Sequence, residues 1–267
     1  MDRITSTQNR RIKGIRKLFR RRIRRITGLC LVEGIHPVLQ ALDSRTPVET
    51  VVVCPEQLES EVGIRAAEQA EERGIEVLPV SADVFSSISS RDNPVGMAAV
   101  ARPRYSTVDE IQLTEEAVLT VLLEIGNPGN LGTIVRTIDA TGGSGAVLVG
   151  QTTDPFDPTA IRASMGTVFS VPLVRIDSME DLLRNLRTRG VGLVTTSARA
   201  ETDLARARFP RPCAVLLGSE NAGIPGELLR EGDLQVRIPM RGRASSLNLA
   251  VAAGIILYEA TKCRDGE

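Results

Sequence analysis

Short apolar runs alternate with polar segments along the chain, and their lengths predict alternating strands and helices. In the N-terminal third, apolar runs of strand length lie at 29–34, 49–54, 75–80 and 96–103. The segment 5–27 predicts a basic helix, because five apolar residues recur at helical spacing among its arginines: Ile12, Ile15, Leu18, Phe19 and Ile23. The alternation predicts a compact α/β unit over residues 1–102.

A polar stretch with one proline, residues 103–117, predicts a linker. Stronger apolar runs follow it, at 117–124, 145–150, 169–176, 190–196, 213–218 and 234–240. Near-continuous apolar runs suit strands that are buried on both faces of a parallel sheet. Helical patterns fill the gaps at 131–141, 157–165, 178–189, 224–230 and 246–262. The pattern predicts a doubly wound α/β domain over residues 118–267, in which ligands gather at the carboxyl ends of the strands.

The net charge of zero hides an uneven distribution along the chain. Residues 1–25 carry eleven basic side chains and one acidic one, so the rest of the chain has a net charge of about −10. A basic block of this kind predicts an arm that binds nucleic acid or another polyanion. The alternative interpretation is a solvated helix face that binds nothing.

Cysteine and histidine usage argues against several classes of protein. The four cysteines have neither CxxC nor zinc-like spacing: Cys30, Cys54, Cys213 and Cys263. We therefore expect no metal site, and we expect the thiols to be reduced in a cytoplasmic protein. The single histidine, His36, precedes a proline on an apolar helical pattern and is expected to cap or pack a helix. No apolar run reaches the roughly 18 residues of a membrane span, and the basic N-terminus predicts no secretory signal.

Three predicted strands end in loops of unusual composition. These loops are "NPGNLGTIVRT" from Asn127, "LLGSENAGIPGELL" from Leu216 and "VRIPMRGRASSLNLAVAAGIILYEA" from Val236. All three follow carboxyl ends of strands, so we expect them on one edge of the sheet. Arg136 falls on the second turn of a predicted helix, where a guanidinium can form two parallel hydrogen bonds with a phosphate. Taken singly, each loop is also explained as an ordinary turn or helix cap, with Ser246 as the N-cap of the last helix.

Together, in this order and spacing, the loops resemble the three motifs of the SpoU/TrmH group of RNA ribose 2′-O-methyltransferases, in the SPOUT superfamily. The resemblance covers residues 118–262. The N-terminal part, with "ITSTQN" and "LCLVEG", resembles the ribosomal-protein-like α/β domain with which this group binds its substrate. The residues "ASSLN" before "LYEA" are similar to those of actinomycete rRNA methyltransferases that confer antibiotic resistance.

The resemblance implies an α/β fold with a deep C-terminal trefoil knot, S-adenosylmethionine as the cofactor, and a homodimer. It implies catalytic roles for Asn130, Arg136, Glu220, Ser246 and Asn248. It implies that the cofactor is bound by Thr196, Leu217, Gly218, Ser219, Ile238, Met240 and Leu247. The phosphates of RNA, with 23S rRNA as the expected substrate, are predicted to contact basic side chains: Arg20, Arg21, Arg24, Arg25, Arg162, Arg241 and Arg243.

Methyl transfer from a sulfonium to a hydroxyl needs alignment of two reactants and a better nucleophile, and it needs no metal. In the family's proposal the motif-one arginine, here Arg136, is the general base. A guanidinium is protonated at neutral pH, so an equally physical role is to clamp a phosphate and stabilise developing alkoxide charge.

Three other functions stay open: a tRNA 2′-O-methyltransferase, a non-catalytic RNA-binding or ribosome-assembly protein, and a nicotinamide dehydrogenase. The dehydrogenase would lack its GxGxxG fingerprint. The target nucleotide, and the choice between a housekeeping and a resistance role, are also open.

Overall fold

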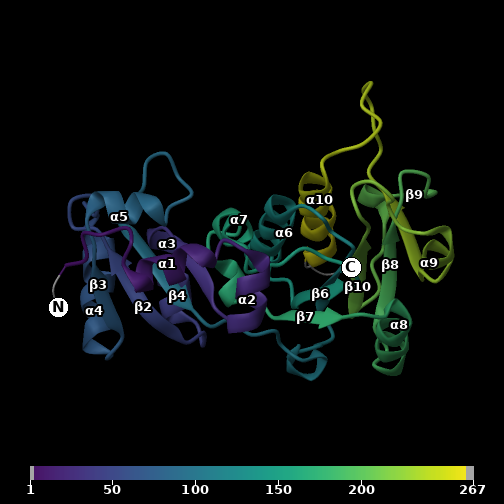
Figure 1. Cartoon of the computed structure of the whole chain (residues 1–267). Coiled ribbons are helices and arrows are strands. Elements are labelled where there is room, and N and C mark those ends of the chain that lie inside the picture. The colour runs from purple at the N-terminus through teal and green to yellow at the C-terminus, as the bar shows by residue number, and fades with distance from the viewer. Residues whose placement is uncertain (1–2, 263–267) are drawn as a thin grey trace. The chain divides into compact units, whose positions relative to one another are not determined.

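The computed structural model describes residues 3–262, which fold as two compact units (Figure 1). The N-terminal unit contains the chain up to Arg104 together with Asp154–Ser170. The C-terminal unit contains Tyr105–Thr153 and the chain from Val171 onward. The segment Asp154–Ser170 thus packs with the N-terminal unit, although its sequence neighbours on both sides belong to the other one.

The N-terminal unit is built on a four-stranded mixed sheet with the order β1-β4-β2-β3. These strands are β1 (Cys30–Glu33), β2 (Val48–Val53), β3 (Glu76–Pro79) and β4 (Met97–Ala101). β4 pairs antiparallel with β1 and β2, while β2 and β3 run parallel. The strands lie where the apolar runs of the sequence predict them.

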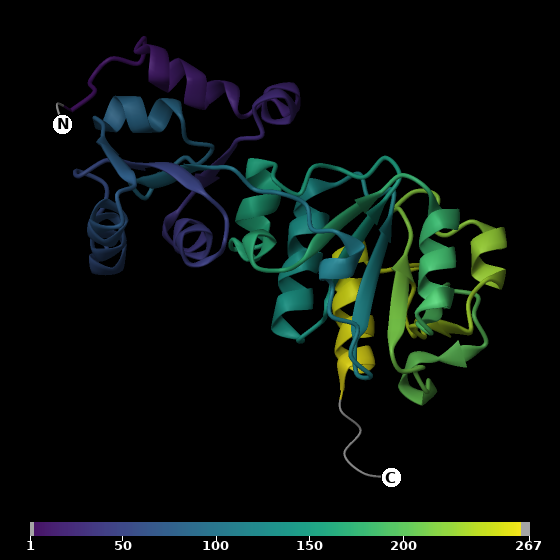
Figure 2. The same ribbon diagram turned by 90° about the horizontal axis from the view of Figure 1, so that it is seen from below.

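Helices cover both faces of this sheet (Figure 2). On one face lie α1 (Arg10–Lys17) and α5 (Ala82–Ser87), and on the other α3 (Ile35–Asp43) and α4 (Glu61–Glu72). The apolar side chains of α1 and α5, Ile12 and Phe85 among them, join those of the strands in one buried cluster. The later segment adds α7 (Pro158–Ala163), which packs beside β1, and the 3₁₀ turn η2 (Thr167–Phe169).

The predicted single helix over 5–27 is wrong, because the chain bends after α1 and starts again as α2 (Arg21–Thr27). The Asn9 side chain caps α1 by accepting a hydrogen bond from the Arg11 amide at 2.9 Å. α2 ends at Gly28, which adopts φ 68, a left-handed conformation that glycine tolerates. The bend turns one side of α2 toward the interior of the unit.

The C-terminal unit contains a seven-stranded sheet with the order β7-β6-β5-β10-β8-β11-β9. Its strands are β5 (Val118–Leu123), β6 (Gly145–Val149), β7 (Leu173–Ile176), β8 (Gly192–Thr196), β9 (Thr202–Asp203), β10 (Cys213–Leu217) and β11 (Leu234–Arg237). Every neighbouring pair is parallel, which confirms the predicted parallel sheet. The prediction started β7 too early, because residues 167–169 form η2, and it missed the two-residue β9.

Helices again lie on both faces of the sheet. α6 (Pro128–Ala140) and α10 (Leu249–Thr261) cover one face, and α8 (Met179–Thr188) and α9 (Gly226–Arg230) the other (Figure 2). The short 3₁₀ turns are η1 (Val108–Glu110), within the predicted linker, and η3 (Leu204–Arg206). The predicted N-cap of the last helix, Ser246, is wrong: Asn248 caps α10 and accepts from the amides of Ala250 and Val251.

The fold class expected from the sequence is confirmed, whereas the trefoil knot stays a prediction. Cys30, Cys54 and Cys213 are free, buried thiols, and Cys263 lies outside the described residues. Within residues 3–262, no helix is both long and apolar enough to cross a membrane. The same residues contain no group of three or more side chains that could hold a metal ion.

Candidate active site

A cavity of about 360 Å³ opens at the carboxyl ends of β8, β10 and β11 in the C-terminal unit. Parallel strands end at the same edge of a sheet, so their following loops converge there. All the residues predicted to bind the cofactor line this cavity: Thr196, Leu217, Gly218, Ser219, Ile238, Met240 and Leu247. The structure therefore brings together three stretches that are far apart in the sequence.

The loop after β10 closes on itself through two glycines. A Cβ atom at Gly218 would lie 2.3 Å from the carbonyl group of Gly223, so the close approach requires glycine at position 218. Gly223, at φ 66, donates its amide to the Ser219 carbonyl oxygen at 2.9 Å. The Ser219 hydroxyl accepts from the Ala222 amide at 3.2 Å. This tight turn holds Glu220 at the rim of the cavity.

The cavity combines an apolar wall with main-chain donors. Its apolar wall is formed by Ile224, Val236, Leu249, Ala252 and Ile256. In the described part of the chain, the amides of Gly218, Ile238 and Leu247 donate to no other backbone or side-chain group. Among the described lining residues, Glu220 carries the one carboxylate, and the one guanidinium, of Arg237, is paired with Asp203 at 2.6 Å. The site therefore suits a ligand with a flat apolar part, polar edges and a positive charge.

Three of the predicted catalytic residues form a hydrogen-bonded chain at the rim of the cavity. The Asn248 amide nitrogen donates to the Asn130 side-chain oxygen at 3.1 Å, and the Asn130 nitrogen donates to Glu220 Oε1 at 2.8 Å. Asn248 starts α10, Asn130 lies in the first turn of α6, and Glu220 follows β10. Asn127 caps α6 by accepting from the Asn130 amide at 3.1 Å, which fixes the start of that helix.

The other two predicted catalytic residues have no such contacts. Ser246 lines the cavity, and its exposed hydroxyl forms no hydrogen bond among the described residues. Arg136 is exposed on α6 and is absent from the cavity lining. It forms neither a hydrogen bond nor an ion pair within residues 3–262. The structure of one chain thus joins Asn130, Glu220 and Asn248 but leaves Arg136 outside the cavity.

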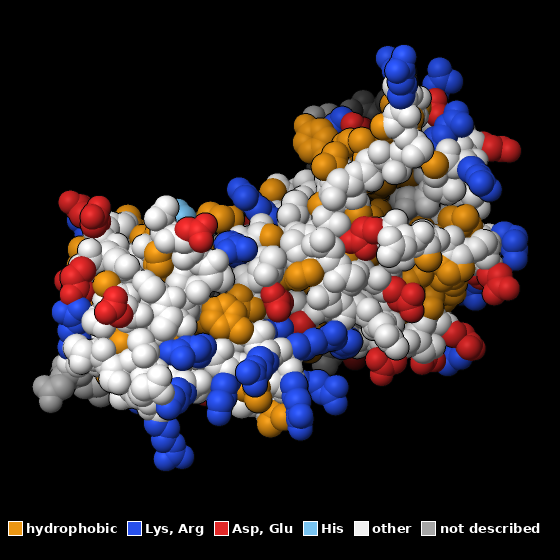
Figure 3. Space-filling model, turned by 45° about the horizontal axis from the view of Figure 1, so that its top comes forward, with side chains coloured by type: hydrophobic (Ala, Val, Ile, Leu, Met, Phe, Trp, Pro, Cys, Tyr) orange, Lys and Arg blue, Asp and Glu red, His pale blue; other side chains and the backbone are white. Residues whose placement is uncertain are grey.

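Basic side chains gather over α1 and α2, and others stand at the tip of the loop before α10 (Figure 3). Arg20, Arg21 and Arg25 are exposed on or beside α2. Arg241 and Arg243 are exposed in the loop between β11 and α10. These positions leave the five side chains accessible to a polyanion.

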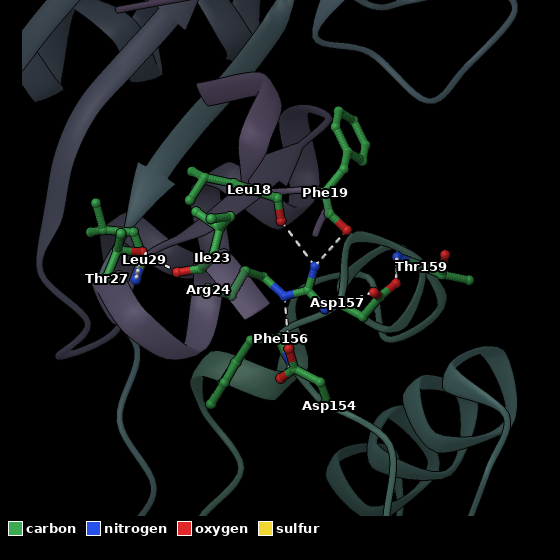
Figure 4. Close-up of polar contacts among 10 residues, drawn as sticks. All are labelled: Leu18, Phe19, Ile23, Arg24, Thr27, Leu29, Asp154, Phe156, Asp157 and Thr159. Carbon is green, nitrogen blue, oxygen red and sulfur yellow. Dashed lines mark hydrogen bonds and ion pairs between the residues drawn. The ribbon is translucent and has the colours of Figure 1, made fainter. Parts of the chain in front are cut away.

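Arg24 differs from its neighbours, because its side chain is only 4% exposed. Its Nε atom donates to Asp154 at 2.7 Å and its Nη2 atom to Asp157 at 2.8 Å (Figure 4). Its Nη1 atom donates to the carbonyl oxygens of Leu18 and Phe19. This burial contradicts the prediction that Arg24 contacts RNA; the residue instead ties α2 to the segment that carries α7.

Arg162, on α7, belongs to the N-terminal unit and does not line the cavity. Its Nη1 atom donates to the Ser90 hydroxyl at 3.2 Å. The expectation that Arg162 lies near the edge of the active site treated residues 118–267 as one domain. Packing with β1 places this segment in the other unit.

The sequence interpretation missed several residues that line the cavity. Ser197 follows β8, and Ser245 lies in the third motif directly before Ser246. Ile224 and Ala252 belong to the apolar wall of the cavity. Ala252 lies in a run of small residues on the last helix, a composition that permits close packing. The two serines and Ile224 carry no signal of their own, because serine is common in ordinary turns and a single isoleucine is common in any core.

Two family models match the chain. The SpoU rRNA Methylase family model matches residues 117–258, and the MRM3-like substrate binding domain model matches residues 9–99. The second match covers most of the N-terminal unit before the later segment joins it.

Individual relatives match over nearly their whole length. The Bacillus subtilis 23S rRNA (guanosine(2553)-2′-O)-methyltransferase RlmP is 31% identical over 97% of this chain and 98% of its own. The Streptomyces viridochromogenes 23S rRNA (uridine(2479)-2′-O)-methyltransferase is 31% identical over 98% of this chain and 92% of its own. A crystal structure of an AdoMet-bound rRNA methyltransferase from Sinorhizobium meliloti is 40% identical, with a TM-score of 0.86 and 97% coverage of both chains.

Proposed function

Because the chain belongs to the SpoU rRNA methylase family, we propose that it transfers a methyl group from S-adenosylmethionine to a ribose 2′-hydroxyl of 23S rRNA. The observation that carries this proposal is the chain of hydrogen bonds from Asn248 through Asn130 to Glu220. It draws one residue from each of the three motifs to the rim of a single cavity. The non-catalytic alternative gives no reason for this convergence.

The cavity fits S-adenosylmethionine in three respects. Its apolar wall suits the faces of an adenine ring, and the amides of Gly218, Ile238 and Leu247 are available to polar edges of a ligand. The carboxylate of Glu220 stands at the rim, where it is favourable to a nearby positive charge. When bound, the cofactor supplies an activated methyl group on a sulfonium.

The rim residues of this chain are proposed to orient the acceptor ribose. Asn248 is held by the first amides of α10, and it in turn orients Asn130. Glu220 accepts from Asn130 and so holds the Asn130 side chain at the rim of the cavity. Ser246, with a free hydroxyl at the same rim, is available to the ribose. Alignment of this kind supplies up to about 7–11 kcal/mol of the barrier reduction in favourable cases.

A homodimer would explain the position of Arg136. On α10, Val251, Ile255 and Tyr258 are 52%, 39% and 60% exposed and recur at i, i+4 and i+7, which forms an apolar stripe on one helix face. A Cβ atom at Gly254, in the same stretch, would meet nothing within 4 Å, so a second helix can approach closely there. α6, which carries Arg136, packs against α10. We propose that this stripe joins two copies and that Arg136 serves the partner's cavity.

The N-terminal unit is proposed to bind the RNA around the target nucleotide. The exposed arginines of α2 and of the loop before α10 supply contacts to phosphates, which give affinity without sequence information. Both curated relatives named above match this chain through both units, and both are named for 23S rRNA. This supports rRNA over tRNA and a cytoplasmic location.

The test is ribose-methylation mapping of total rRNA and tRNA after incubation with the protein and labelled S-adenosylmethionine. We expect one 2′-O-methylated nucleotide in 23S rRNA, and none with the Asn130→Ala variant. Label in tRNA alone would replace the rRNA assignment by the tRNA alternative. Binding of RNA without any label would favour the non-catalytic alternative, and a thermal shift with NAD but not with S-adenosylmethionine would favour a dehydrogenase.

A further inference from the structure

The start of α3 in the N-terminal unit has no side-chain cap. Gly34 precedes the helix at φ 105, and the first turn contains Ile35, His36 and Pro37 and no acidic residue. In the described part of the chain, the Ile35 and His36 amides donate to no other group, and Pro37 has no amide hydrogen. The positive end of the helix dipole is therefore open at this point.

A buried carboxylate lies directly before this helix, but its hydrogen-bonding capacity is already used. Glu33 is 6% exposed. It accepts from the hydroxyls of Ser89 and Ser90 and from the Ser90 amide at 2.9 Å. These bonds hold the loop after α5 against the end of β1. Within residues 3–262, Glu33 forms no ion pair with an arginine.

Arg91, in the same loop, lies beside the uncapped helix start. A Cβ atom at Gly34 would be 3.2 Å from the Arg91 Nη2 atom and 3.7 Å from Cζ. The Arg91 backbone is fixed by the Ser89 hydroxyl, which accepts from its amide at 3.0 Å. Its Nε atom is buried and has no hydrogen-bond partner. Among the described residues, no carboxylate pairs with Arg91, and the exposed neighbour Asp92 does not either.

Arg162 reaches the same loop from α7. It is exposed, and its one hydrogen bond among the described residues goes to the Ser90 hydroxyl at 3.2 Å. The turn after α7 packs tightly on α3, since a Cβ atom at Gly166 would lie 2.8 Å from the Pro37 Cα atom. Arg162 is therefore held close to the start of α3 by two contacts that do not neutralise its charge.

We propose that this group, formed by the start of α3 with Arg91 and Arg162, binds a backbone phosphate of the RNA substrate. The group is called the α3 phosphate site below. Free helix amides, a helix dipole and two guanidinium groups without carboxylate partners are the features that bind phosphate in proteins. The inference rests on the proposed function, because it takes RNA to be the polyanion.

RNA fits this site better than a small free anion does. The two guanidinium groups approach from different elements, and Arg162 is exposed, so the site is open to a long chain. The exposed arginines of α2 lie in the same unit and would contact other phosphates of the same molecule. The α3 phosphate site would therefore fix the register of the RNA on the N-terminal unit.

The test compares three variants of the full-length protein with wild type: Arg162→Gln, the double variant Arg91→Gln/Arg162→Gln, and Arg73→Gln. Arg73 is an exposed arginine at the end of α4 in the same unit, so it is the matched control. The probe is a fluorescein-labelled transcript of the 23S rRNA segment that contains the nucleotides named for the two relatives. We expect the double variant to bind roughly tenfold more weakly, with a smaller effect for Arg162→Gln. The salt slope, which is the slope of log K against log salt concentration, should become about one unit less steep in the double variant.

A fourth variant, His36→Glu, separates binding from folding. His36 is exposed in the first turn of α3. A carboxylate there interacts favourably with the helix dipole, so the melting temperature should stay equal or rise. The same carboxylate repels phosphate, so RNA affinity should fall. A purely structural role of the site does not predict these opposite changes.

The site is refuted if wild type methylates rRNA while the two arginine variants and His36→Glu bind RNA like Arg73→Gln. A fall in affinity without a change in salt slope would also overturn it, because a phosphate contact releases counterions. Wild-type protein that binds no rRNA in the presence of S-adenosylmethionine would instead overturn the proposed function. The two failures are therefore distinguishable in one series of measurements.

Discussion

The Asn248 side chain donates to the Asn130 side-chain oxygen at 3.1 Å, although 118 residues separate them. The direction of this bond follows from the helix cap: the Asn248 oxygen accepts from the first amides of α10, so its nitrogen must face Asn130. The Asn130 oxygen is then occupied, and its nitrogen must face Glu220. One helix cap thus sets the orientation of the whole chain of three residues.

Asn248→Asp should keep the helix but disrupt the chain of hydrogen bonds. Aspartate caps about as well as asparagine, so we expect the free energy of unfolding to change by less than about 1 kcal/mol. The new carboxylate cannot donate to Asn130, and methyl transfer should fall on the order of 100-fold. Asn127→Asp, at the cap of α6, makes the same chemical change and is the control in a labelled-methyl assay. Equal activity of the two variants would contradict the orienting role of Asn248.

Arg24→Gln should destabilise the N-terminal unit, whereas Arg25→Gln should not. Loss of the buried guanidinium removes the donor to the Oδ2 atoms of Asp154 and Asp157 and to two carbonyl oxygens, and only backbone amides then bond the two carboxylates. This should cost about 3 kcal/mol in urea unfolding. Arg25 is exposed, and its loss should instead weaken RNA binding. Arg24→Lys, which keeps the charge, should be intermediate if Arg24→Gln does not fold. Equal urea midpoints for Arg24→Gln and Arg25→Gln would contradict the structural role of Arg24.

Ile255→Glu should produce a monomer in size-exclusion chromatography with light scattering. The substitution puts a charge into the exposed apolar stripe of α10, where a dimer would bury it without a partner. Val62→Glu, at a residue 55% exposed on α4, is the matched control and should leave the mass unchanged. Wild-type protein that already has the mass of one chain would disprove the dimer.

Mixing two inactive variants tests whether Arg136 serves the partner's cavity. In co-expressed Arg136→Ala and Asn130→Ala chains, half of the dimers are mixed, and each mixed dimer regains one intact site if Arg136 acts across the dimer. About a quarter of wild-type activity is then expected. If Arg136 acts within its own chain, every site carries a substitution and no activity returns.

Arg136→Lys distinguishes a phosphate clamp from a base. Lysine keeps the charge but loses the planar fork, so a clamp predicts that RNA affinity and rate both fall while part of the activity remains. Calorimetry should show unchanged binding of S-adenosylmethionine. Arg175→Lys, at an exposed arginine of β7, is the control. A variant without activity that binds RNA and cofactor normally would rule out the clamp.

Cys213 should resist alkylation at pH 8, because burial raises the pKa of its thiol to about 11. Only about one thiol in a thousand is then ionised, and the thiolate is the reactive form. The pKa in the folded protein lies above the unfolded value of about 8.5. The contribution of the neutral thiol to the free energy of unfolding is therefore fully present below about pH 8.5 and is lost as the pH rises toward 11. Mass spectrometry after iodoacetamide treatment checks the reactivity. Equally fast labelling of native and urea-unfolded protein would contradict it.

Local patterns predict the elements that depend on near neighbours. The apolar runs identify the strands of both sheets except β9, because buried strands need near-continuous apolar side chains. The sequence places Gly218 directly after a predicted strand, and the structure shows that it approaches Gly223 as only glycine can. The parallel sheet predicts that the three loops meet at one edge, and the resemblance to the SpoU/TrmH group supplies the individual cofactor residues.

Long-range packing decides the rest. The sequence alone determined the alternation of strands and helices, the basic N-terminal segment and the three motifs, since each is set by residues close along the chain. Only the tertiary structure decided that Arg24 is buried while Arg25 is exposed, and that Asp154–Ser170 joins the N-terminal unit. It also decided that Asn130 meets Asn248 while Arg136 stands apart. These outcomes depend on contacts between distant segments, and the period of a helix or strand carries no information about which distant partner a side chain will meet.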